Sequence, residues 1–212
     1  MSIQTTIYNI KEERINTWSH FFGLILSVIG LILLLQKAFE LKSMMHIISY
    51  AIFGLSMIIL YLASTLYHGA KDLEKRKKLN VFDHIAIYFL IAGTYTPLTM
   101  LVLKGVWGWS IFGAVWGIAC VGLVLKLFFT GRFNLASTIS YVLMGWVIVI
   151  AIKPLLANLS TQGFIWLGIG GAFYSIGAIF YSIKKIPYNH ATFHFFVLGG
   201  SISHFIAIYW YI

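Results

Sequence analysis

The chain has 212 residues, of which 60% are hydrophobic and only 10% charged, and its formal net charge is +9. A soluble globular domain is about half apolar and about a quarter charged, so this composition excludes one and indicates an integral membrane protein. The basic residues stand in short loops beside apolar stretches, which is typical of membrane topology rather than of nucleic-acid binding.

Seven apolar stretches are long enough to cross a bilayer, which takes about 20 residues each. We expect helices over 17–36, 45–68, 82–102, 106–129, 134–153, 162–182 and 190–211. No long linker or soluble insertion interrupts them. The predicted fold class is therefore all-α, a seven-transmembrane helix bundle that forms one domain over residues 1–212.

The polar N-terminal stretch lacks the basic, apolar and small-residue sections of a signal peptide, so the first helix should remain in the mature protein. Cys120 is the single cysteine, which excludes an intramolecular disulfide and a cysteine-based zinc site.

Lysine and arginine residues fix the expected orientation. Four face one side of the membrane in the predicted topology, namely Lys37, Lys42, Lys104 and Lys153. Eleven face the other side, namely Lys11, Arg14, Lys71, Lys75, Arg76, Lys77, Lys78, Lys126, Arg132, Lys184 and Lys185. Because basic residues concentrate in cytoplasmic loops, we expect a cytoplasmic N-terminus and an extracytoplasmic C-terminus.

Ionisable residues inside predicted spans gather near this cytoplasmic face. They come from four helices that are far apart in the sequence: His20, His68, Asp83 with His84, and His190 with His194. Such residues are costly in a membrane and each needs a functional or structural reason. His46 and His204 lie at other depths; we expect His46 at the outer interface and His204 as a polar residue lining the bundle.

The spacing of two of these histidines favours a metal site. His190 and His194 are four residues apart, so they share a helix face with Cβ atoms roughly 5–6 Å apart. This geometry suits two imidazoles that bind one zinc ion, and His68 can supply a third nitrogen. Three protein ligands with an open fourth position are typical of a catalytic zinc site. The alternative is three interfacial histidines hydrogen-bonded to headgroups or water.

The same spacing pairs Asn16 with His20 and Ser64 with His68, which predicts polar partners that orient the ligands. Asp83 has two interpretations, a general base beside the metal or a salt bridge to a basic residue of the adjoining loop. We expect Asp83 rather than His84 to point inward.

Two further residues have alternative roles. Ser64 can contact the reacting groups or bond back to the carbonyl of Leu60. Glu13 precedes the predicted first helix, where it can cap that helix or join a charge network near the metal. It ranks below Asn16 as a site residue.

Three ordered elements resemble a known family. "ERINTWSH" (Glu13, Asn16, His20) resembles its E-x-x-N-x-x-x-H element; "STLYH" followed by "FDH" (Ser64, His68, Asp83) resembles S-x-x-x-H…D; and "HATFH" (residues 190–194) resembles H-x-x-x-H. Together they resemble the hemolysin III family, bacterial relatives of the progesterone and adipoQ receptors. The resemblance implies a seven-helix protein of the bacterial inner membrane with a cytoplasm-side zinc held by the three histidines, close to a superfamily that includes alkaline ceramidases.

The expected function is a zinc-dependent hydrolase, with membrane lipids as partners and a lipid amide or ester as substrate. Two other functions remain open. In one, a structural zinc joins the second and seventh helices of a protein that senses membrane state or lyses foreign membranes. The other is proton or ion transport, for which the sequence shows no continuous chain of ionisable groups.

Overall fold

The computed structural model describes residues 8–130 and 133–212, and every regular element in this part of the chain is helical. The elements are α1 (Ile10–Glu40), α2 (Met44–Gly69), α3 (Leu73–Pro97), the π-helix η1 (Leu98–Leu103), α4 (Gly105–Phe129), α5 (Asn134–Gly145), the 3₁₀ helix η2 (Val147–Ala151), α6 (Ile152–Asn158), α7 (Thr161–Ser182) and α8 (Asn189–Tyr211).

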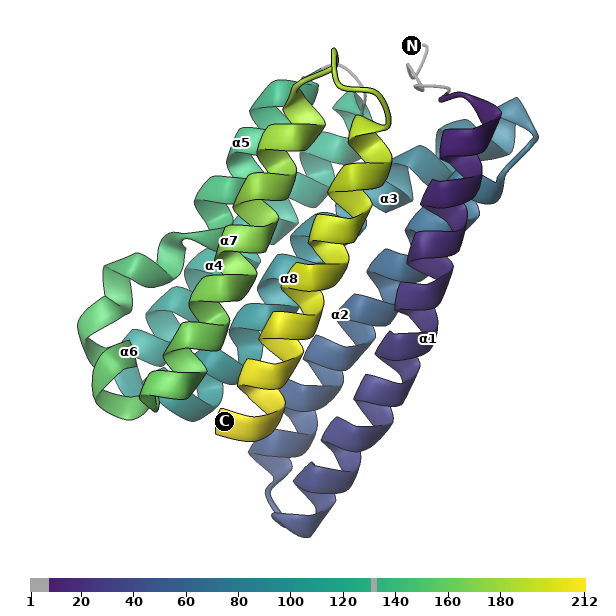
Figure 1. Cartoon of the computed structure of the whole chain (residues 1–212). Helices are drawn as coiled ribbons and strands as arrows, with labels where there is room; N and C mark the ends of the chain where they lie inside the picture. Colours follow the sequence, from purple (N-terminus) through teal and green to yellow (C-terminus); the bar gives the residue numbers. More distant parts are fainter. Residues whose placement is uncertain (1–7, 131–132) are drawn as a thin grey trace.

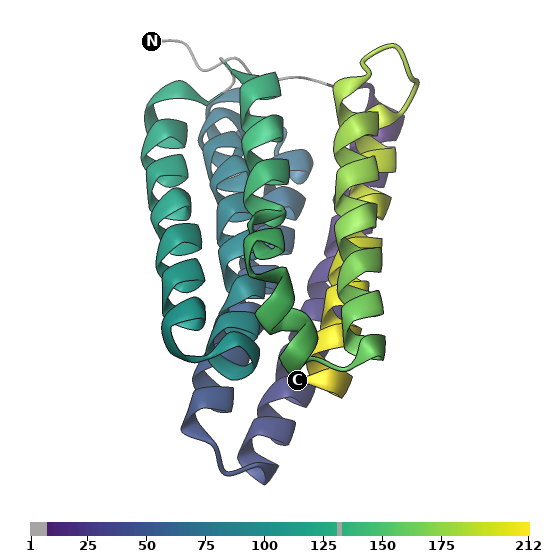
Figure 2. The same cartoon turned by 90° about the vertical axis from the view of Figure 1, so that its left-hand side faces the viewer.

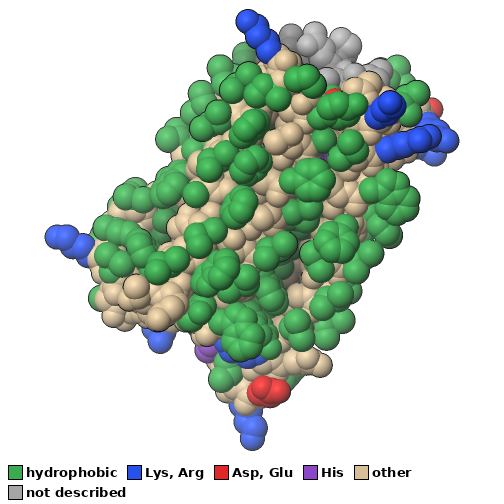
Figure 3. Space-filling view, in the orientation of Figure 1, with side chains coloured by type: hydrophobic (Ala, Val, Ile, Leu, Met, Phe, Trp, Pro, Cys, Tyr) green, Lys and Arg blue, Asp and Glu red, His purple; other side chains and the backbone are tan. Residues whose placement is uncertain are grey.

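These elements form the seven predicted spans. The third span joins α3 to η1, and the fifth joins α5, η2 and α6, so seven helical segments are long and apolar enough to cross a membrane. The start of α1 and the end of α8 lie at opposite ends of the bundle (Figure 1), as an odd number of spans requires. Apolar side chains cover most of the face seen in Figure 3, and lysine and arginine lie at its two ends.

Two helices begin earlier than the sequence predicts. α1 begins at Ile10 instead of 17, and α3 begins at Leu73 instead of 82. Each start has a polar N-cap, because the side chains of Asn9 and Asp72 accept a hydrogen bond from the backbone N–H three residues later. The first turns are polar and stand outside the apolar stretch, so hydropathy alone misses them.

The early starts decide where the polar residues lie. Residues 10–16 and 73–81 are therefore helical, and the acidic residues in the first turn of α1 have fixed directions. Of the eleven residues predicted on the basic side, Arg132 lies outside the described residues. Two others do not face solvent or headgroups, since Arg76 is 6% exposed and Lys126 is 4% exposed.

The core has two parts that share α3. One part packs α1, α2 and α8 around residues such as Tyr50, Phe53 and Leu198. The other packs α3, α4 and the fifth span around Val115 and Met144. α3 is the most buried of the seven spans and contributes to both parts.

A cavity of about 160 Å³ separates these two parts, and residues of α2, α3, α5, α7 and α8 line it. In Figure 2 the ribbons of α3–α5 and those of α7 and α8 form two groups. The cavity reaches the end of the bundle where α8 begins, which is where the predicted site residues lie.

Candidate metal centre

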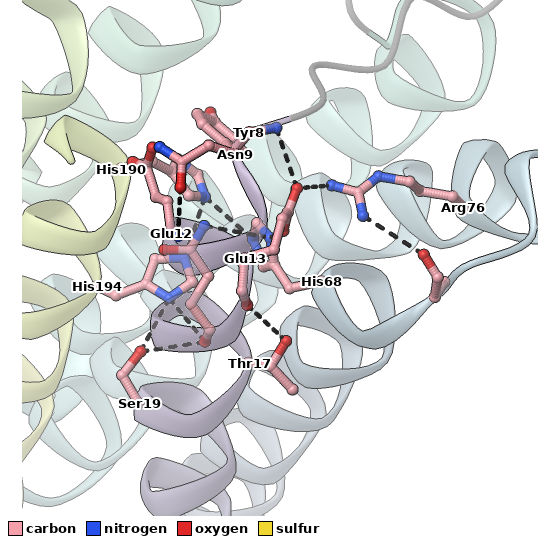
Figure 4. A network of polar contacts seen from close by, with 12 residues as sticks. Tyr8, Asn9, Glu12, Glu13, Thr17, Ser19, His68, Arg76, His190 and His194 are labelled. Atoms are coloured by element: carbon pink, nitrogen blue, oxygen red, sulfur yellow. Dashed lines mark hydrogen bonds and ion pairs between the residues drawn. The ribbon is translucent and has the colours of Figure 1, made fainter. Parts of the chain in front are cut away.

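Three histidine side chains meet beneath the N-terminal end of α1 (Figure 4). His68 comes from the last turn of α2, and His190 and His194 come from the first turns of α8. Nε2 of His190 lies 3.1 Å from Nε2 of His68 and 3.1 Å from Nε2 of His194. All three residues are buried. The structure thus brings together the three histidines that the sequence analysis assigned to one metal.

Two acceptors determine which nitrogens of these rings carry protons. Nδ1 of His68 lies 2.7 Å from a carboxylate oxygen of Glu13, and Nδ1 of His194 lies 3.2 Å from the backbone carbonyl of Asn16. Both acceptors need an N–H, so Nδ1 is the protonated nitrogen of each ring. In the neutral imidazoles, Nε2 of His68 and Nε2 of His194 therefore present lone pairs to Nε2 of His190.

Hydrogen bonds among the three rings cannot provide a partner for every Nε2 atom. Nε2 of a neutral His190 has at most one proton, so it can donate to only one of its two neighbours. A cation at the meeting point accepts all three lone pairs. Two nitrogens that bind one zinc ion at about 2.0–2.1 Å in a tetrahedral site lie roughly 3.3 Å apart, close to the spacing found here. The cluster therefore fits a metal ion held by three imidazoles.

Glu13 is in direct contact with the histidine cluster through His68. Its carboxylate accepts from Nδ1 of His68 and is paired with Arg76, whose guanidinium stacks over the ring of Tyr67 at 4.8 Å. The side-chain amide of Asn16 reaches Nδ1 of His68 only at 3.5 Å. The prediction that Glu13 precedes the first helix was wrong, because Glu13 lies on the first turn of α1. Asn9, not Glu13, provides the side-chain cap of that helix.

His20 lies against the cluster without bonding to it. Its ring stacks on that of His194, with centroids 3.6 Å apart and an angle of 8° between the planes. Both ring nitrogens of His20 are buried and make no hydrogen bond to any described residue. Besides the carbonyl of Asn16, the hydroxyl oxygen of Ser19 lies near Nδ1 of His194, at 3.3 Å. His20 therefore supports the position of the His194 ring by stacking.

Asp83 and Ser64 line the cavity together with His190 and His194. Asp83 interacts electrostatically with His68, and the Ser64 side chain is placed to hydrogen-bond with its carboxyl group. The ion pairs of the described residues join Glu13 to His68 and Arg76, and Glu74 to Lys77. No basic side chain of the described loops pairs with Asp83, so the carboxylate faces the cavity.

The expectation that His84 turns away from the interior was wrong. His84 and Asp83 both line the cavity, although they are about 100° apart around the helix. The reason is the central position of α3, which has neighbours on several sides. Asp83 interacts with His68 of α2, and the carbonyl of His84 accepts a hydrogen bond from Tyr141 of α5.

Comparison with known proteins identifies the family of the chain. Residues 8–205 match the family model described as "Haemolysin-III related". The chain belongs to the hemolysin III family. It is 47% identical to the "Hemolysin-3 homolog" of Bacillus subtilis (strain 168) over 205 residues, which cover 97% of this chain and 96% of that protein. It is 44% identical to "Hemolysin-3" of Bacillus cereus over 203 residues, which cover 96% and 93% of the two chains.

A more distant relative is the human "Monocyte to macrophage differentiation factor", 25% identical over 212 residues that cover 95% of this chain and 84% of that protein. No solved structure matches the chain. Family membership and the seven apolar helical segments together make the chain a multi-pass protein of the plasma membrane.

The sequence analysis of this hemolysin III protein missed two residues of the site, Tyr8 and Arg76. Tyr8 contacts His190 and Glu13, and Arg76 contacts Glu13. The ring of Tyr8 stacks on His190 with centroids 4.6 Å apart, and its backbone N–H donates to Glu13. Burial raises the pKa of the Tyr8 phenol well above its ordinary value, so the hydroxyl stays protonated. Arg76 was counted only as a loop charge. Its partner Glu13 is 63 residues away, and no local spacing reveals such a pair.

The carboxylate of Glu13 holds His68 in the tautomer that presents Nε2 to the metal site. Glu13→Gln keeps the size of this side chain but removes its charge, so we expect metal affinity to fall by about 10- to 100-fold. Competition with a metal chelator measures this change. Glu74→Gln removes an exposed carboxylate elsewhere on the chain and should leave the affinity unchanged. An equal loss in both variants would exclude a specific role for Glu13.

Proposed function

We propose that this protein is a zinc-dependent hydrolase that cleaves a lipid amide or ester at the cytoplasmic face of the membrane. The observation that carries the proposal is the convergence of three imidazole nitrogens beside a cavity that also contains the carboxylate of Asp83. Three neutral nitrogen ligands suit zinc. The cluster contains three protein ligands rather than the four of a typical structural zinc site.

Zinc bound by His68, His190 and His194 would polarise a carbonyl group and lower the pKa of water at its open position. The chain itself holds and orients the groups that react. Glu13 and the carbonyl of Asn16 fix the proton positions of two ligands. The stacked rings of His20 and Tyr8 restrict the orientations of His194 and His190.

Asp83 is the proposed general base, with its carboxyl group positioned by Ser64. It accepts a proton as the oxygen of a water molecule attacks the carbonyl carbon of the substrate. The bond from that carbon to the leaving nitrogen or oxygen then breaks, and Asp83 returns the proton to the leaving group. Water is consumed, and the products are a carboxylic acid and an amine or alcohol.

The lining of the cavity supports a lipid substrate. Beyond the polar residues at the metal end, the lining includes apolar side chains such as Leu90, Ile91 and Val142. These side chains can accept a hydrocarbon chain. The proposed cytoplasmic location follows from the predicted excess of basic residues at the same end of the bundle.

The test is hydrolysis of purified lipids by the zinc-loaded protein in detergent. We expect release of fatty acid from at least one amide or ester lipid, loss of that activity after chelation, and recovery on addition of zinc. Mass spectrometry of the products identifies the bond that breaks. A folded, zinc-loaded protein that cleaves no lipid of a broad panel would reject the hydrolase and favour a structural role for the metal.

A further inference from the structure

A second polar cluster combines residues of α3 and α5 that line the cavity with a lysine of α4 that does not line it, and the proposed reaction does not use this cluster. Its charged member is Lys126, in the last turn of α4. A lysine near the end of a membrane helix usually extends its ammonium group toward the headgroups. Lys126 instead is only 4% exposed, and its Nζ donates a hydrogen bond of 2.6 Å to the hydroxyl of Ser137 on α5.

No carboxylate of the chain compensates this charge. The chain has six acidic residues: Glu12, Glu13, Glu40, Asp72, Glu74 and Asp83. All six lie among the described residues, and the carboxylates that form ion pairs there do so with His68, Arg76 and Lys77. A buried ammonium group without an anion is unfavourable. An anionic ligand would remove that cost.

His84 provides a second polar group without a partner in the same place. Lys126 is the charged residue that acts most strongly on its imidazole. Nδ1 of His84 is buried and has no hydrogen-bond partner among the described residues. His84 and Ser137 both line the cavity, so an anion there can approach both. The Ser137 hydroxyl accepts a hydrogen bond from the ammonium group of Lys126 and donates its own proton to the carbonyl of Phe133, so it holds the ammonium group beside the cavity.

The position of the cluster indicates the kind of anion. His84 is adjacent in sequence to Asp83, which faces the metal site at the end of the bundle, and the deeper lining is apolar. A ligand that fits has an anionic group at the edge of the membrane and hydrocarbon chains toward its middle. A phosphate group suits such a site, because it has several strong acceptor oxygens for the ammonium group of Lys126 and the imidazole of His84.

We propose that Lys126, held by Ser137, and His84 bind the phosphate of an anionic membrane lipid whose chains occupy the apolar part of the cavity. The site rests on the geometry of these three residues. That the bound lipid is also the substrate rests on the proposed hydrolase. Taken together, the two proposals name an anionic glycerophospholipid as the substrate class.

The experiment measures equilibrium binding to the full-length protein in detergent by isothermal titration calorimetry. The probes are a short-chain diether phosphatidylglycerol, the dialkylglycerol with the same chains but no phosphate, and inorganic phosphate alone. Ether-linked probes have no ester bond to cleave, so binding is measured whether or not the protein is a hydrolase. We expect the phosphatidylglycerol to bind about tenfold more tightly than the dialkylglycerol, a difference of ~1.4 kcal/mol.

Lys126→Met should abolish this preference, and Lys126→Arg should keep it. Lys185→Met, which removes an exposed lysine at the same end of the bundle, should keep it as well. Because Lys126→Met removes an uncompensated buried charge, the ligand-free variant should melt at or above the temperature of the wild type.

Several results would overturn the site: equal affinities for the two lipids in the wild type, a preference that survives Lys126→Met, or the same loss in Lys185→Met. Inorganic phosphate that binds as tightly as the lipid would assign the cluster to a free anion instead. Binding of the phosphatidylglycerol without hydrolysis of any lipid would reject the hydrolase and support the phosphate site. Lipid hydrolysis without a preference for phosphate would support the hydrolase and reject the phosphate site.

Discussion

Wild-type protein purified without chelator is expected to contain about one zinc ion per chain, and His68→Ala, His190→Ala and His194→Ala should each lose it. Each substitution removes one of three converging nitrogens, and two remaining imidazoles hold zinc far more weakly. Elemental analysis by mass spectrometry gives the metal content, and circular dichroism verifies that each variant is folded.

His46→Ala is the matched control for the metal measurement. His46 lies in the first turn of α2, at the opposite end of that helix from His68, and its ring nitrogen contacts Ser43. Its loss should leave the zinc content unchanged. A wild-type protein that is folded and free of metal, and that binds no added zinc, would contradict the metal centre and remove the basis for hydrolysis.

Asp83→Asn is expected to lower lipid hydrolysis by about 10²- to 10⁴-fold, the usual contribution of a general base. The amide has nearly the shape of the carboxylate but cannot accept the proton. Zinc content should stay at the wild-type value, because the three histidines are intact. The comparison of turnover with metal content separates a role in proton transfer from a role in holding the metal.

Asp72→Asn makes the same chemical change at the N-cap of α3, where the side chain accepts a hydrogen bond from the backbone of Lys75. Asparagine is as good an N-cap as aspartate, so activity should persist. Full activity in Asp83→Asn would reject the general-base assignment. Loss of zinc in that variant would instead give Asp83 a role in metal retention.

Much of the fold could be predicted because lipid imposes one simple rule on the sequence. A spanning helix needs about 20 apolar residues, and this rule located all seven spans to within a few residues wherever their ends coincide with the apolar stretch. It failed at the starts of α1 and α3, where polar turns extend the helices beyond the apolar stretch. The caps Asn9 and Asp72 were the available signals for those starts.

The clustering of the three histidines could be predicted because the i, i+4 spacing of His190 and His194 is local, and because ionisable residues in spans are rare. Their supporting contacts could not be predicted in the same way. Arg76 looks like any other residue of a basic loop until α3 is known to begin at Leu73. The inward position of His84 follows from the burial of α3 on several sides, which no periodicity along a single helix reveals.

The positions of the ligands along the chain have a consequence for biogenesis. His68 belongs to the second span to be synthesised, whereas His190 follows 122 residues later in the last one. At about 5–20 residues per second, roughly 6–24 s separate their emergence from the ribosome. The three-histidine cluster is therefore complete only once α8 has been made. Metal loading would thus report that membrane insertion is complete, and a chain truncated before α8 would be expected to remain metal-free.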